Sequence, residues 1–204
     1  MKRLNILLIF GLIVIGISIS SCNKTKKQTA VLKILFEQEV KDKPFEFNKF
    51  LYKAKAGYPY EIMTLRYFTS DFDIYTADNH KIHLDTFHYR EADKAHEYTK
   101  ALLIDNFPAG TYEGLSFIHG LNEKWNKPIK GTEAHSLPNT VDEYLDMYWP
   151  WQDDGQYHYM KYEGAYVKDG DTLSFKLHTG PTDGNQNYIK IEKIPFDKST
   201  VNEG

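Results

Sequence analysis

The sequence predicts an all-β protein, an antiparallel β-sandwich of about eight strands, and three observations lead to this fold class. Short runs of alternating apolar and polar residues recur along the chain, and a period of two is typical of half-buried strands. Aromatic residues make up 15% of the 204 residues, with 15 Tyr and 12 Phe, and these residue types favour sheets. Turn residues separate the runs, and helical periodicity is scarce.

Eight runs carry this alternation, in chain order. They are Val31 to Phe36, Tyr60 to Tyr75, Lys81 to Tyr89, Ala101 to Ile104, Thr111 to His119, Tyr157 to Val167, Thr172 to His178 and Tyr188 to Ile194. Turn signals lie between several of them, at Asp78-Asn79, Pro108 to Gly110, Asp169 to Asp171 and Gly180 to Gly184. Short strands spaced in this way are typical of sandwiches and barrels.

The second run changes phase along its length. Met63, Leu65 and Tyr67 share one parity, whereas Phe72 and Ile74 have the other. Because a one-residue shift moves side chains to the opposite face, we expect a bulge or break near Ser70.

Helical signals are confined to short segments. We expect at most one or two helical turns at residues 91–100 and at residues 140–146, the second capped by Asn139 or Thr140. Residues 121–154 contain three prolines and little periodicity, so they form a long loop excursion from the sheet. Loops of this length in a compact domain are usually functional.

The N-terminus predicts a lipoprotein signal peptide over residues 1–21. Lys2 and Arg3 precede an apolar run that ends in Ile19-Ser-Ser-Cys22, which resembles the bacterial lipobox. Cleavage would make Cys22 the first residue and a lipidation site, with residues 22–30 as tether and linker; an uncleaved anchor is the alternative. Since Asn23 follows the cysteine, we expect a lipid-anchored protein of the bacterial cell envelope, at the outer membrane. The folded domain would span residues 31–196, with a tail at 197–204.

Composition excludes several function classes. The formal charge is −3 with acids and bases interleaved, so there is no basic stripe for a nucleic-acid partner. Cys22 is the only cysteine, which leaves the folded domain without disulfide or thiolate chemistry. The sequence has no GxSxG elbow, P-loop or GxGxxG fingerprint, and we expect no enzyme.

Two groups of residues are candidates for binding. The chain has eight histidines, and a protein without thiols builds transition-metal sites from imidazoles; surface or hydrogen-bonded core histidines are the alternative. Trp149 and Trp151 end the long loop and would project to one side of an extended segment. They could contact a glycan or a partner protein, or could plug the open end of the β domain.

Taken in order, a series of motifs resembles the MbnP-like family of bacterial secreted proteins and lipoproteins, related to the methanotroph copper-binding proteins MopE and CorA. The similarity is to the lipoprotein members of the Bacteroidetes type and covers most of residues 31–194. The matching segments are Leu32 to Phe36, Leu65 to Ser70, Asp73 to Tyr75, Phe87 to Tyr89, Pro108 to Tyr112, Ser116-Phe117, Met147 to Trp151, Tyr157 to Gly164 and Phe175 to Gly180.

The resemblance implies a β-sandwich that holds one copper ion through histidines, accompanied in the characterised copper proteins by a tryptophan oxidised to kynurenine. It carries His88 and His178 over as copper ligands, with His119 as a third. In those proteins the modified tryptophan lies two residues before a ligand histidine, where this chain has Thr86, so no kynurenine is expected there. The leading hypothesis is a lipid-anchored protein for copper capture or hand-over. The alternative is a metal-free module that uses residues 147–151 to bind a glycan or an envelope partner protein.

Overall fold

The computed structural model describes residues 28–40, 43–93, 99–127, 137, 146–149, 156–182 and 185–201. The described residues form strands and no α-helix. The strands are β1 (Thr29–Leu35), β2 (Glu39–Val40), β3 (Lys43–Pro44), β4 (Tyr52–Lys53), β5 (Pro59–Thr76), β6 (Lys81–Glu91), β7 (Ala101–Pro108), β8 (Gly110–His119), β9 (Tyr148–Trp149), β10 (Gln156–Tyr157), β11 (Met160–Lys168), β12 (Asp171–Thr179) and β13 (Ile189–Val201). Within these ranges there is consequently no helix that could span a membrane.

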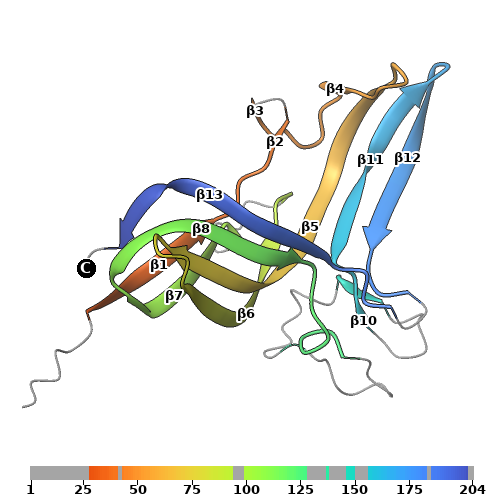
Figure 1. Ribbon diagram of the computed structural model, residues 1–204. Helices are drawn as coiled ribbons and strands as arrows, with labels where there is room; N and C mark the ends of the chain where they lie inside the picture. The colour runs from red at the N-terminus through yellow and green to blue at the C-terminus, as the bar shows by residue number, and fades with distance from the viewer. Residues whose placement is uncertain are drawn as a thin grey trace, which may run out of the picture.

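Strand β5 is the longest strand and has different neighbours along its two edges. One edge pairs with β6 from Arg66 to Tyr75. The other edge is divided: β11 pairs with its first half, up to Tyr67, and β8 pairs with its second half, from Thr69 onward. Beyond these strands, β12 pairs with β11 and β13 pairs with β8, so the two halves of the sheet diverge from β5 (Figure 1).

The two halves meet at Phe68. Its N–H donates to the carbonyl oxygen of Tyr159 at 2.9 Å, just before β11, and its carbonyl oxygen accepts from the N–H of Gly120 at 2.9 Å, just after β8. The backbone polar groups of β5 therefore stay paired where one neighbour ends and the other begins.

The phase change predicted near Ser70 is a bulge in the structure. The register between β5 and β6 shifts between Ser70 and Phe72, and Asp71 has φ of 51°. Because of the extra step, Tyr67 before the bulge and Phe72 after it pack in the same core cluster. The prediction is confirmed.

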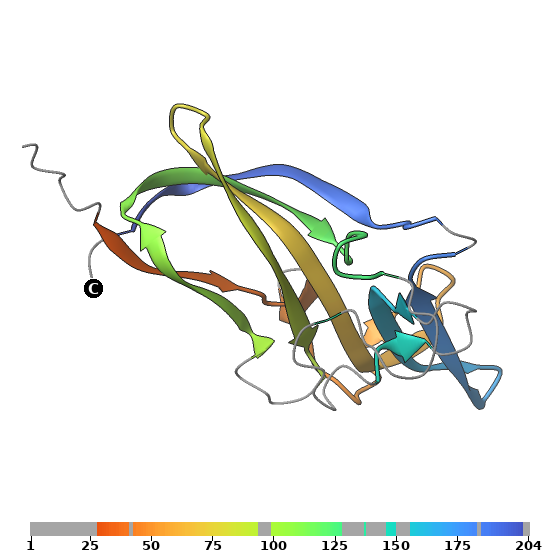
Figure 2. The ribbon, with the colours of Figure 1, turned by 90° about the horizontal axis from the view of Figure 1, so that it is seen from below.

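Apolar clusters cover both faces of this sheet. On one face, Phe68 and Tyr89 pack with residues of the excursion, including Leu121 and Met147. On the other face, Phe72 packs with Phe36 and Leu102; these two residues belong to, or directly follow, the separate two-stranded sheet β1–β7. Figure 2 shows β1 and β7 as a ribbon of their own beside the curved sheet.

The all-β antiparallel sandwich is thus confirmed, and each of the eight predicted runs lies in a strand or overlaps one. Of the expected helical turn at 91–100, residues 91–93 are the end of β6 and a turn, Thr99 lies in a 3₁₀ turn, and residues 94–98 lie outside the described residues. The expected turn at 140–146 lies outside the described residues except for Asp146. The signal peptide, Cys22, Trp151 and most of the excursion also lie outside them.

Phe68→Ala tests the junction. The Phe68 side chain has no exposed surface, so its truncation should lower the free energy of unfolding by about 3–5 kcal/mol. Urea unfolding followed by circular dichroism measures this change. Leu103→Ala is the control, because Leu103 is 60% exposed and its loss should change stability by no more than about 0.5 kcal/mol. Equal effects of the two substitutions would contradict the structural role of Phe68.

Candidate metal centre

His178 lies on β12 with an ionic partner on the neighbouring strand. It pairs in register with Lys161 of β11, so both side chains lie on the same face of the sheet, and Glu163 follows two residues later on that face. The Nε2 atom of His178 lies 2.5 Å from Oε1 of Glu163. A carboxylate on one ring nitrogen orients the imidazole and leaves the other nitrogen, Nδ1, available to a metal.

His158 lies next to His178. The two ring centroids are 4.7 Å apart, with an angle of 60° between the rings. On its other side, His158 stacks on Trp149, with centroids 4.6 Å apart and an angle of 23°. The short ribbon of β9 and β10 brings these residues together, because Trp149 pairs with Gln156 and the N–H of His158 donates to the Met147 carbonyl oxygen at 2.7 Å.

The His158 imidazole is buried in the structure. Its Nδ1 atom has no hydrogen-bond partner among the described residues. Burial lowers the pKa of His158 to about 4, and the nearby charges of His178 and Lys161 contribute further. The ring is therefore neutral at neutral pH and keeps a nitrogen lone pair. A buried nitrogen without a partner is costly, and a metal ion is one ligand that would satisfy it.

The predicted ligands His88 and His178 are not brought together. Thr69 of β5 pairs with His88 on one edge and with His119 on the other, so these three side chains share a face. His178 instead shares a face with Arg66, through Lys161. Because Arg66 and Thr69 are three residues apart on a regular stretch of strand, the two faces are opposite.

His88 has a structural environment of its own. Its Nε2 atom lies 2.8 Å from the carbonyl oxygen of Thr99, and its ring stacks on Phe36 with centroids 4.7 Å apart. Burial lowers the pKa of His88 to about 4, and the charge of Arg90 adds to this. The ring of His119 lies beside the ring of Tyr67, with centroids 5.5 Å apart. Burial lowers the pKa of His119 as well.

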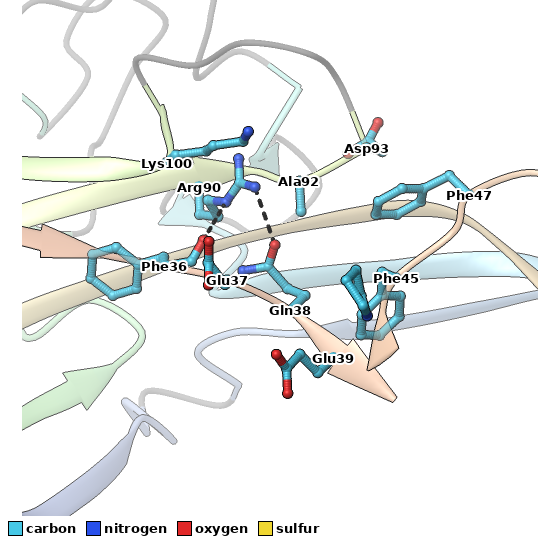
Figure 3. A pocket seen from close by; sticks show the side chains of 11 residues that line it. Phe36, Glu37, Gln38, Glu39, Phe45, Phe47, Arg90, Ala92, Asp93 and Lys100 are labelled. Carbon is cyan, nitrogen blue, oxygen red and sulfur yellow. Dashed lines mark hydrogen bonds between the residues drawn. The ribbon is translucent and has the colours of Figure 1, made fainter. Parts of the chain in front are cut away.

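Two other polar features fit a metal or ligand less well. Ligand atoms of Asp71, His83 and Asp85 lie within 4.8 Å of one another, but His83 and Asp85 are exposed and the Lys124 ammonium already pairs with Asp85. On the Tyr67 face, a cavity of about 450 Å³ is lined in part by Arg90. The Arg90 guanidinium donates to Phe36 O and Gln38 Oε1 (Figure 3). It also donates to Glu91 O and Thr99 Oγ1, so most of its hydrogen-bond donors are already used within the protein.

Sequence reasoning missed His158. The residue lies in the segment Tyr157 to Gly164 that carries part of the family resemblance, but no spacing rule connects it to His178 or Trp149. The three residues meet because β9 pairs with β10 and β11 forms a hairpin with β12, and the alternation within a single strand does not reveal these pairings.

A known protein family matches this chain over most of its length. The model of the MbnP family matches residues 29–204. The chain belongs to the MbnP family. The motif-based resemblance to this family is thereby confirmed.

A solved structure shows the same fold. MbnP from Methylosinus trichosporium superposes with a TM-score of 0.59 at 16% sequence identity, over 83% of this chain and 73% of that one. No curated protein matches the chain. At this identity the structural likeness shows the fold alone, so the assignment of ligands depends on the geometry of this chain.

His88→Asn tests whether His88 is structural. The folded state favours the neutral form of His88. As the pH is lowered from 6.5 to 4, His88 is protonated in the unfolded chain before it is protonated in the folded protein, so the folded protein loses stability. The variant should lose about 1–3 kcal/mol of stability at pH 7, because it removes the buried hydrogen bond to the Thr99 carbonyl and the stacking on Phe36. Its stability should also decline less steeply over that pH range. Urea midpoints measured at several pH values would show this; identical slopes for variant and wild type would contradict it.

Proposed function

We propose that the protein binds a copper ion at His158 and His178 and serves metal capture or hand-over in the bacterial cell envelope. The observation that carries the proposal is the buried Nδ1 of His158, which has no partner among the described residues. It lies beside a His178 imidazole whose Nε2 is held by Glu163. Two imidazole rings with a carboxylate behind one of them suit a copper ion better than hard cations, which prefer oxygen ligands.

Each residue has a definable role toward the ion. His158 and His178 would supply nitrogen ligands, and copper would be the cargo of the site. Glu163 would fix the tautomer of His178. Trp149 covers one face of the His158 ring, which keeps water from that side of the ligand. We infer a binding role without catalysis, and membership of the MbnP family supports it.

Placement at the membrane is part of the proposal. Lipidation at Cys22 would tether the domain to the outer membrane, and the 22–30 linker would let it meet an envelope partner protein that receives or delivers the metal. The lipobox-like sequence supports this placement.

The alternative of a metal-free module that binds a glycan or a partner through the aromatic loop finds less support. A ring that stacks on a sugar needs a free face, and His158 occupies one face of Trp149, with ring centroids 4.6 Å apart. Trp151, the other residue of that prediction, lies outside the described residues.

Copper titration against a competing chelator tests the proposal on the purified full-length protein in detergent. Wild type should bind one equivalent of copper, and His158→Ala or His178→Ala should lower the affinity at least about 100-fold, since each removes a ligand. His88→Ala and His119→Ala are the matched controls and should keep wild-type affinity, because both side chains lie on the opposite face. Loss of copper in the controls, with uptake retained in the first two variants, would place the ion at His88 and His119.

A further inference from the structure

A small network of charges lies beside the candidate metal centre, on the same face of the sheet. Asp146, at the end of the excursion, contacts the guanidinium of Arg66 on β5 through Oδ2. Its Oδ1 lies 3.4 Å from the Lys161 ammonium on β11, and its carbonyl oxygen accepts a hydrogen bond from the same ammonium. Arg66 and Lys161 are direct neighbours in register.

The two cations depend on Asp146 to different degrees. Arg66 also pairs with Asp93 at 2.9 Å and with Glu91 at 3.4 Å, so it remains compensated without Asp146. For Lys161, Asp146 is the only acidic partner within the described part of the chain. The Lys161 side chain is only 14% exposed, so water screens its charge poorly.

Lys161 lies where its charge affects a bound cation. It is paired in register with His178, and its charge acts on His158. Without Asp146, a positive charge would stand beside both proposed ligands and would repel a metal ion.

Asp146 also begins the segment that builds one side of the centre. The next residue, Met147, accepts the backbone hydrogen bond of His158, and Trp149 stacks on the His158 ring. The pairing of Asp146 with β5 and β11 thus holds this segment against the sheet.

We propose that Asp146 is a positioning residue of the metal centre, which compensates the charge of Lys161 and anchors residues 146–149 so that His158 and His178 accept a cation. This inference rests on the proposed function. Residues that act behind metal ligands typically change metal affinity by about 10- to 100-fold. The part of the effect that comes from Lys161 should weaken as salt screens its charge.

The experiment compares copper affinities of the full-length protein at low and high ionic strength, for wild type, Asp146→Asn, Asp146→Glu and Asp146→Asn combined with Lys161→Met. Asp146→Asn should lower the affinity about 10- to 100-fold at low salt and by less at high salt. Asp146→Glu and the double variant should each recover most of the loss. Circular dichroism should show all variants folded, since the Asp146 side chain is 52% exposed.

Glu113→Gln is the matched control, because it also removes a carboxylate that pairs with a lysine. Glu113 pairs with Lys193 at 3.2 Å and is not one of the residues of the metal centre. It should leave copper affinity unchanged. Wild-type affinity in Asp146→Asn would overturn the inference while leaving the proposed function intact. A loss that neither salt nor Lys161→Met relieves would overturn the compensating role. Absence of copper uptake by wild type would overturn both proposals.

Discussion

The backbone hydrogen bonds of Phe68 hold together a sheet whose halves have different neighbours on the same edge of β5. A strand that changes neighbours risks leaving polar groups unpaired, and burying such groups is costly. Tyr159 and Gly120 supply the two partners at that point, and the Phe68 side chain fills the core directly beneath them. Two features depend on this junction at Phe68: the packing of the core on that face, and the approach of β11 to the end of β8.

The same junction decides where a metal centre can form. β11 begins immediately after Tyr159, so His158 lies at the junction itself, and β12 brings His178 alongside through the hairpin turn at Asp169 and Gly170. On the same face, Asp146 of the excursion meets Arg66 and Lys161. The centre therefore combines a rigid sheet with one segment of a long loop, an arrangement that binding sites commonly use.

Local pattern was sufficient for much of the fold. Period two located all eight long strands, and the parity change between Tyr67 and Phe72 located the bulge, because burial of alternate side chains is a property of the strand itself. Gly164 shows the limit of such reasoning. A Cβ atom there would lie 2.0 Å from the carbonyl oxygen of Glu61 on β5, so the glycine is required by a neighbour that is distant in sequence. The short strands β2, β3, β4 and β9 were missed because two residues are too few to show a period, and β10 was merged with the run that begins at Tyr157.

The sequence by itself determined the strand content, the alternation that makes an antiparallel sandwich, and the family through its ordered motifs, because each is written in residues close together in the chain. Tertiary structure alone decided which histidines meet. His88 and His178 were paired as the best family matches, yet register places them on opposite faces, and His158 reaches His178 only because β9, β10 and β11 pack as they do. Parity along one strand is a local property, whereas which strands become neighbours depends on the free energy of the whole core.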